Sequence, residues 1–137
     1  SKPRITAKAR ELFSLVHLDE RAQARTSAQV SGGEAQRTSI VRALINDPEL
    51  VFADEPTGAL NSHNSQAVLD VFCTLHANGQ SIVMVTHDRH SALRANRVLY
   101  LRDGAIAGEC TLGAWDGDEP YGEREHTLAV FLNEMGW

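Results

Sequence analysis

Two helical patterns open the chain. Apolar side chains recur at helical spacing over residues 5–18, which predicts an amphipathic helix, and the polar residues 19–30 are expected to connect it to the next element. A second helix is expected to begin at Ser31 and to end at Asn46-Asp47-Pro48, because proline disfavours helical geometry in the residue before it. Its apolar face is formed by Ala35, Ile40, Val41, Leu44 and Ile45.

Two short apolar runs follow, with a third helix between them. Residues 49–54 and 81–86 are almost continuously apolar, as expected of parallel strands that are buried on both faces. Ser62 is expected to cap the intervening helix, which stops at Asn78-Gly79 and carries Val68, Leu69, Phe72 and Leu75. Together with the strand predicted over 97–102, the alternation of strands and helices indicates an α/β fold with a parallel sheet and right-handed crossovers.

The last part of the chain predicts a short helix, a hairpin and a terminal helix. The short helix is expected over residues 88–96. Strands 97–102 and 105–109 flank Asp103-Gly104, a strong signal for a two-residue hairpin turn. After a loose segment, 110–123, a helical stripe is formed by Leu128, Phe131, Leu132 and Met135. We expect this stripe to dock on the body of the protein rather than to face a membrane.

Charge is unevenly distributed along the 137 residues. Residues 1–109 carry 12 basic and 12 acidic side chains, whereas residues 110–137 carry six acids against Arg124 alone, which gives the net charge of −5. A balanced body with an acidic tail argues against binding to nucleic acid or to an anionic membrane surface. Since the longest wholly apolar run, Leu128–Leu132, has five residues, nothing in the sequence would span a bilayer. Two cysteines form no disulfide framework and favour a reduced, intracellular chain.

The lysines exclude one common nucleotide-binding motif. The chain has only Lys2 and Lys8, and neither follows a glycine. A phosphate loop of the Gly-Lys-Ser/Thr type is therefore absent from this sequence.

Polar residues follow both predicted buried strands. Asp54 and Glu55 end the first strand, and His87 follows the second. Because ligands of open parallel sheets gather at the carboxyl ends of the strands, these side chains are expected at one edge. One carboxylate suits Mg²⁺, and the next could accept a proton from an attacking water. Acids after a strand are equally consistent with solvation of a loop.

Ser31-Gly32-Gly33 precedes a helix and is a candidate anion site. The first backbone N–H groups and the helix dipole favour an anion there, and glycine allows close approach. The same three residues also form an ordinary cap and turn, so the motif by itself leaves both interpretations open.

In combination, these motifs closely resemble the ATP-binding-cassette (ABC) ATPases. The match runs in order from about residue 8 to residue 109, and it looks most like the subfamily that exports macrolides and peptides or releases lipoproteins. The segments that carry it are Val30–Arg37, Arg42–Leu44, Asp47-Pro48, Leu50–Leu60 and Val85–Asp88. The resemblance implies a partial P-loop NTPase (RecA-like) parallel sheet flanked by helices, which lacks the phosphate-loop strand and ends in a β-hairpin and a terminal helix.

The resemblance also implies roles for individual residues. Glu55 matches the general base, Asp54 the aspartate that holds Mg²⁺ through water, and His87 the switch histidine that contacts the γ-phosphate. The signature motif, which binds ATP held by the opposite subunit, matches Ser31, Gly32, Gly33 and Glu34, although glutamine is commonest at the position of Glu34. The D-loop matches Ala59, Leu60 and Asn61, although the family usually has aspartate at the position of Asn61.

The resemblance covers only the C-terminal half of a nucleotide-binding domain. Residues 1–30 match the remainder of the helical subdomain, 31–109 the second half of the ATPase core, and 110–137 an acidic linker with a C-terminal helix. Loss of the phosphate-loop strand is expected to leave a gap between strands 81–86 and 97–102, closed either by local rearrangement or by self-association. The chain alone is expected to be inactive and to bind no ATP or Mg²⁺.

Two interpretations of the whole protein remain. In the first, the chain is a piece of an ABC transporter subunit that hydrolyses MgATP with a second ATPase subunit and drives a membrane permease at the cytoplasmic face of the cell membrane. In the second, it is a naturally truncated, non-catalytic module that supplies signature and D-loop surfaces to a partner. Ser1 as the first residue favours the first interpretation.

Overall fold

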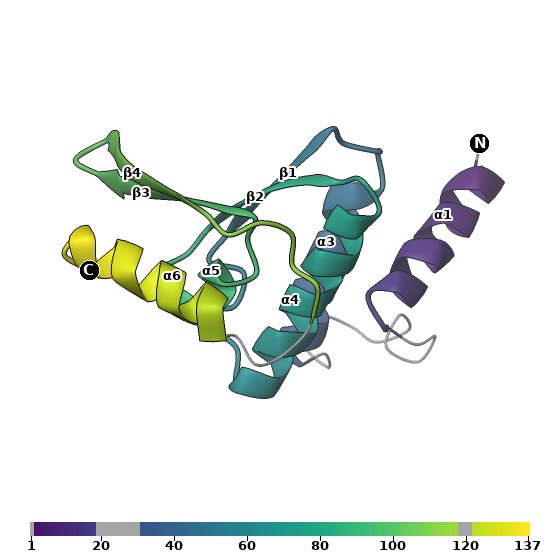
Figure 1. Cartoon of the computed structure of the whole chain (residues 1–137). Coiled ribbons are helices and arrows are strands. Elements are labelled where there is room, and N and C mark those ends of the chain that lie inside the picture. The colour runs from purple at the N-terminus through teal and green to yellow at the C-terminus, as the bar shows by residue number, and fades with distance from the viewer. Residues whose placement is uncertain (1, 19–30, 118–121) are drawn as a thin grey trace. The chain divides into compact units, whose positions relative to one another are not determined.

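A computed structural model describes residues 2–18, 31–117 and 122–137 (Figure 1). The predicted connection over 19–30 and part of the predicted loose segment 110–123 lie outside the described residues. The chain forms two compact units that divide between Thr86 and His87. Within the described ranges, no helix has the length and apolar character needed to cross a membrane.

Within residues 2–18 and 31–86, the first unit contains in order α1 (Lys2–Leu15), α3 (Gly32–Leu44), β1 (Leu50–Asp54), α4 (Ser62–Ala77) and β2 (Ser81–Val85). The strands pair in parallel, from Leu50 opposite Ser81 to Asp54 opposite Val85. The two predicted strands and the three predicted helices are thus confirmed, with ends that shift by one to three residues.

One face of the β1–β2 pair lies in the core. Val51 and Ala53 of β1 are buried, and Ile82 and Met84 of β2 pack on the same cluster. The remaining buried side chains of the cluster are Ile40, Val41 and Leu44 of α3, Val68, Val71, Phe72 and Leu75 of α4, and Val16 and Leu18 after α1. Helices α3 and α4 lie next to each other beneath the strands (Figure 1).

The other face of the pair is open, which corrects the expectation that both strands are buried on both faces. Its apolar side chains are Leu50, Phe52, Val83 and Val85, with exposed fractions of 42%, 72%, 42% and 55%. The apolar character of these residues led to the prediction of burial, which is wrong for this face. Within the described residues of the first unit, no segment packs against this side of the strands. We call Leu50, Phe52, Val83 and Val85 the open face.

The ends of α4 show one correction and one confirmation. Its N-cap is Asn61 rather than Ser62, because the Asn61 side chain accepts a hydrogen bond from the Asn64 N–H at 2.9 Å. The helix stops as predicted at Asn78, where Gly79 adopts a φ of +95° that favours glycine.

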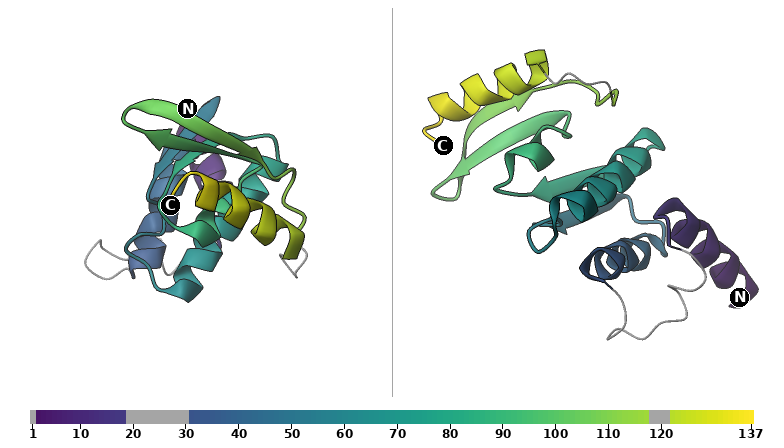
Figure 2. Two further views of the ribbon diagram at one scale, coloured as in Figure 1. Left: turned by 60° about the vertical axis from the view of Figure 1, so that its left-hand side comes forward. Right: turned by 90° about the horizontal axis from the view of Figure 1, so that it is seen from below.

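The second unit is a hairpin covered by a helix. It contains α5 (Arg89–Ala92), β3 (Arg97–Arg102), β4 (Ala105–Thr111) and α6 (Gly122–Glu134). Positive φ angles at both Asp103 and Gly104 form the predicted two-residue turn. Helix α6 lies along the hairpin (Figure 2), and Leu128, Phe131 and Leu132 are buried as the predicted stripe requires. Helix α5 is shorter than the predicted range 88–96.

Strand pairing limits the parallel sheet to β1 and β2. Among the described strands, β2 pairs only with β1, and β3 pairs only with β4, in an antiparallel ladder. The local rearrangement that would have paired 81–86 with 97–102 is therefore not what the structure shows, and the third predicted parallel strand belongs to the hairpin instead. The second edges of β2 and β3 therefore pair with no described strand, and their backbone groups can pair with another chain. Self-association stays a prediction.

Arg124, the only basic residue after residue 109, ties the second unit together. Its guanidinium donates hydrogen bonds of 2.6–3.2 Å to the carbonyls of Leu93, Ala95, Leu112, Gly113 and Ala114. The same group lies 5.4 Å from the Trp115 ring, which Arg94 approaches to 4.4 Å. One side chain of α6 thus joins the segment after α5 to the segment after β4.

Candidate functional site

The carboxyl end of β1 places two acids in succession. Asp54 is the last residue of the strand, is exposed, and lies opposite Val85 in the ladder. Glu55 follows with a φ of 44°, in the left-handed region that is uncommon for a residue with a side chain. Backbone conformations of this kind are retained where the surroundings hold them, often at functional sites. The structure therefore separates the two carboxylates by a sharp change in chain direction.

Three hydrogen bonds hold Glu55 in this conformation. Its N–H donates to the carbonyl of Val85 at 2.8 Å, which extends the β1–β2 ladder by one residue. Its carbonyl accepts from the Gly58 N–H at 3.1 Å, closing the turn that follows. Its Oε2 lies 3.4 Å from the Thr86 hydroxyl, which donates to it. Both backbone and side chain of Glu55 are thus tied to the end of β2 and to the next turn.

Ser31 starts α3 with a reciprocal pair of hydrogen bonds. Its side-chain oxygen accepts from the Glu34 N–H at 3.2 Å, and its own N–H donates to Glu34 Oε2 at 2.7 Å. This capping box fixes the first turn of the helix and satisfies two of its end groups. The predicted ATP-contacting residue Glu34 is therefore also a structural part of the helix start.

The two glycines after Ser31 bring α3 against the start of α4. A Cβ on Gly33 would lie 2.8 Å from Cγ and Oδ1 of Asn64, and one on Gly32 would lie 3.4 Å from Leu60. Neither N–H of these glycines is used by the capping box. The structure thus brings the predicted signature residues next to the segment predicted as the D-loop.

The predicted D-loop leads directly into α4. Ala59 is exposed, Leu60 is half-buried, and Leu60 N–H donates to the Thr57 carbonyl at 3.0 Å. Asn61 is the N-cap described above, a position where asparagine and aspartate serve about equally well. Asparagine at position 61, where the ABC family more often has aspartate, therefore removes a charge and still caps α4.

His87 belongs to the second unit and is exposed. The next residue, Asp88, is the N-cap of α5 and accepts hydrogen bonds from the Ser91 hydroxyl at 2.7 Å and the Ser91 N–H at 2.9 Å. Partial burial opposes the charged form of Asp88, but these bonds and the nearby His90 outweigh it and lower the pKa of the carboxyl. Asp88 thus anchors the turn that carries His87.

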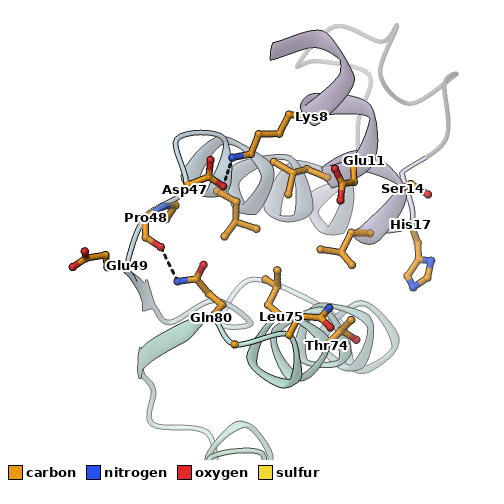
Figure 3. A pocket seen from close by; sticks show the side chains of 15 residues that line it. Lys8, Glu11, Ser14, His17, Asp47, Pro48, Glu49, Thr74, Leu75 and Gln80 are labelled. Carbon is orange, nitrogen blue, oxygen red and sulfur yellow. Dashed lines mark hydrogen bonds and ion pairs between the residues drawn. The ribbon is translucent and has the colours of Figure 1, made fainter. Parts of the chain in front are cut away.

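A hollow of about 1010 Å³ lies at the opposite end of the strands of the first unit. Its lining comes from α1, from the ends of α3 and α4, and from the turns before β1 and β2 (Figure 3). Lys8 forms an ion pair with Asp47 across it, and Gln80 Nε2 donates to the Pro48 carbonyl at 3.1 Å. None of the predicted site residues lines this hollow, so the candidate chemistry lies at the carboxyl ends of β1 and β2.

Comparisons with known proteins agree with these motifs. The model of the ABC transporter family matches residues 2–58. The chain is 47% identical over 100 residues to the macrolide export ATP-binding/permease protein MacB of Mannheimia succiniciproducens. It is 46% identical over 112 residues to the lipoprotein-releasing system ATP-binding protein LolD of Aquifex aeolicus. These matches show that the chain is similar in sequence to the ATP-binding proteins of ABC transporters.

Solved ABC cassettes share the fold. A dimeric ATP-binding cassette bound to ADP and Pi superposes with a TM-score of 0.68 at 35% sequence identity, over 80% of this chain and 47% of that one. An ABC transporter cassette in its ADP conformation, 19% identical, matches over 95% of this chain with a TM-score of 0.76 and supports the fold alone. These likenesses confirm the partial P-loop NTPase fold expected for an ABC ATPase.

The chain spans only part of its ABC relatives. The matched segments are 73% of this chain and 15% of the macrolide exporter, and 80% of this chain and 50% of the lipoprotein-releasing protein. The activity, substrates and partners of a whole ABC transporter therefore enter below as proposals.

Sequence reasoning assigned no role to Thr86 or Asn64, although both contact predicted ABC site residues. The register of the parallel strands would have indicated Thr86. Because Asp54 lies opposite Val85, the residues that follow them, Glu55 and Thr86, also lie opposite each other. No comparable signal indicates Asn64, because its contact with Gly33 depends on how closely α3 approaches α4.

Proposed function

We propose that the chain is the second half of the ATP-binding subunit of an ABC transporter, and that the complete subunit hydrolyses MgATP. The observation that carries this proposal is the arrangement at the end of β1, where an exposed Asp54 is followed by a Glu55 held from three sides. In a parallel sheet this edge is where ligands gather. The sequence similarity to ATP-binding proteins of two transport systems supports the same assignment.

The acids at this edge fit magnesium and a hydrolytic water. Asp54 is exposed at a strand end, which suits the water-mediated oxygen ligand that Mg²⁺ accepts. Bound Mg²⁺ would neutralise charge that develops on the transferred phosphoryl group. Glu55, displaced by one residue and turned by its left-handed backbone, is the group that would take the proton of the attacking water.

The start of α3 fits the γ-phosphate of a nucleotide held by a second, head-to-tail subunit. The capping box fixes Ser31 before any ligand arrives, while Gly32 and Gly33 keep side chains away from the helix N-terminus. Because Leu60 and Asn64 lie against these glycines, a shift at the D-loop would reach the signature motif directly. His87, in the segment after β2, is proposed as the switch histidine that contacts a γ-phosphate.

The chain by itself is proposed to be inactive. Millimolar affinity for ATP requires about 4 kcal/mol of binding free energy. One exposed helix N-terminus supplies about 0.3–1 kcal/mol. Since neither Lys2 nor Lys8 belongs to a phosphate loop, no other group in this sequence offers the missing part of the cradle.

The proposed partners are a second ATPase subunit and a membrane permease, which would place the complete protein at the cytoplasmic face of the cell membrane. One relative is named an ATP-binding/permease protein, and the other the ATP-binding protein of a lipoprotein-releasing system. For the isolated chain we propose self-association through the open face, because its exposed apolar side chains favour burial. Nucleic acid is not among the proposed partners.

A second candidate is a naturally truncated module that supplies signature and D-loop surfaces to a partner without hydrolysing ATP. It is favoured by one observation: the capping box and the glycine contacts are formed in a chain without a phosphate loop. The coding sequence immediately upstream separates the two. A glycine-rich loop ending in Gly-Lys-Ser/Thr in the same frame supports the catalytic subunit, and a stop codon supports the module.

A further inference from the structure

The Thr86 side chain occupies a defined place beside the proposed base. Thr86 directly follows β2, Glu55 directly follows β1, and the parallel register sets them opposite each other. Both side chains are half-buried, and the Thr86 hydroxyl donates to Glu55 Oε2 at 3.4 Å. This distance is longer than an ordinary O–H···O hydrogen bond. Hydrogen bonds in unliganded active sites are commonly long and tighten when the ligand binds.

The backbone hydrogen bonds of Glu55 do not fix the orientation of its side chain. The bonds to Val85 and from Gly58 hold the peptide groups on either side of the left-handed residue. A glutamate side chain keeps several rotatable bonds, and ordering it costs conformational entropy. A hydroxyl on the neighbouring strand end is suited to offset part of that cost, since β-branching makes the threonine side chain stiff at its first torsion.

We propose that Thr86 is a positioning residue for hydrolysis, whose hydroxyl holds Oε2 of Glu55 and thereby orients the carboxylate that takes the proton of the attacking water. The proposal rests on Glu55 acting as the base. Thr86 itself touches neither nucleotide nor water in this scheme, and it acts through the orientation of the carboxylate. Serine at this position keeps the hydroxyl, whereas valine keeps the shape and removes it.

The first test uses the chain itself and needs no activity. In labelled protein, the three-bond couplings between the backbone N and C′ and the Cγ of Glu55 report whether one rotamer is populated. We expect a single rotamer in the parent chain and in Thr86→Ser, and averaged couplings in Thr86→Val and Thr86→Ala. The control is Thr74→Val, which removes a hydroxyl that donates to the Asp70 carbonyl on the exposed side of α4. Couplings that stay unchanged in both hydroxyl-deficient variants would overturn the proposal.

The second test measures ATP hydrolysis by the full-length protein. Loss of one hydrogen bond predicts about a tenfold fall in kcat for Thr86→Val with an unchanged KM for ATP, and less than about threefold for Thr86→Ser. A rise in KM with unchanged kcat would contradict a positioning role. Glu55→Gln separates this proposal from the one it rests on: full activity of Glu55→Gln removes Glu55 as the base, whereas an inactive Glu55→Gln beside a fully active Thr86→Val removes Thr86 alone.

Discussion

Gly33 lies so close to Asn64 that a Cβ on Gly33 would come within 2.8 Å of the Asn64 side chain. The second glycine of the proposed signature motif is therefore required by the packing of α3 on α4. The Cβ of Asn64 itself would be only 3.1 Å away, so the clash reaches the base of the side chain as well as its tip. A glycine that suits an approaching phosphate also permits the contact between two helices.

Gly33→Ala is predicted to destabilise the first unit. Overpacking of a close contact typically costs about 1–3 kcal/mol. Urea denaturation followed by circular dichroism measures the free energy of unfolding. Gly32→Ala is the matched control, because its Cβ would meet Leu60 at 3.4 Å, near ordinary contact. Asn64→Ala combined with Gly33→Ala should recover much of the loss; equal stability of Gly33→Ala and Gly32→Ala would contradict the steric explanation.

Arg124→Met is predicted to loosen the second unit. The substitution leaves five carbonyls without their charged donor, and hydrogen bonds to charged groups contribute about 1.5–3 kcal/mol each when they can be separated. We expect a loss of about 3 kcal/mol or more in the free energy of unfolding, with faster amide exchange along α6. Arg97→Met, which breaks only the exposed pair with Glu109, serves as the control and should change stability far less.

Asp88 is predicted to make the second unit sensitive to acid. Because the folded-state pKa of Asp88 is lowered below its ordinary value of 3.8, its contribution to stability is present above that value. It is lost as the pH falls through the lower, folded-state pKa. Thermal unfolding from pH 6 to pH 2 should therefore show a larger decline for the parent chain than for Asp88→Asn, which keeps a cap that does not titrate. Parallel declines in the two proteins would exclude this contribution.

Phe52→Asp is predicted to weaken self-association of the isolated chain. Phe52 is the most exposed member of the open face at 72%, so the substitution removes apolar contact area without opening a cavity in the core. Sedimentation velocity over a range of concentrations measures the effect. Ile5→Asp is the control, because Ile5 is also exposed, at 59%, and lies on α1 rather than on the open face. A parent chain that stays monomeric at every concentration would contradict the proposal.

Local signals in the sequence predicted most of the elements correctly. The apolar runs located β1 and β2, the Asp103-Gly104 turn located the hairpin, and the final stripe located the buried side of α6. Each of these depends on residues that are neighbours in the chain, which is why a single sequence suffices for them. A small polar residue before a helical pattern also predicted that Ser31 begins a helix, and Ser31 is the N-cap of α3.

What the sequence did not predict depends on contacts between distant segments. Asn61 rather than Ser62 caps α4, a difference of one residue that composition cannot resolve, because both types are good caps. Burial of β1 and β2 on a second face requires a covering segment that the described residues of the first unit do not provide. Arg124 was visible only as the single basic residue of an acidic tail, since its five carbonyl partners are assembled by the fold.

The central claim is that Glu55 takes the proton of the attacking water, and Glu55→Gln in the full-length protein tests it most directly. Phosphate release should fall by about a hundredfold or more, because general-base catalysis contributes on that scale, while ATP binding measured by calorimetry stays intact. Glu49→Gln, an exposed glutamate at the opposite end of β1, should hydrolyse ATP at the parent rate. Hydrolysis by Glu55→Gln at the parent rate would contradict the account.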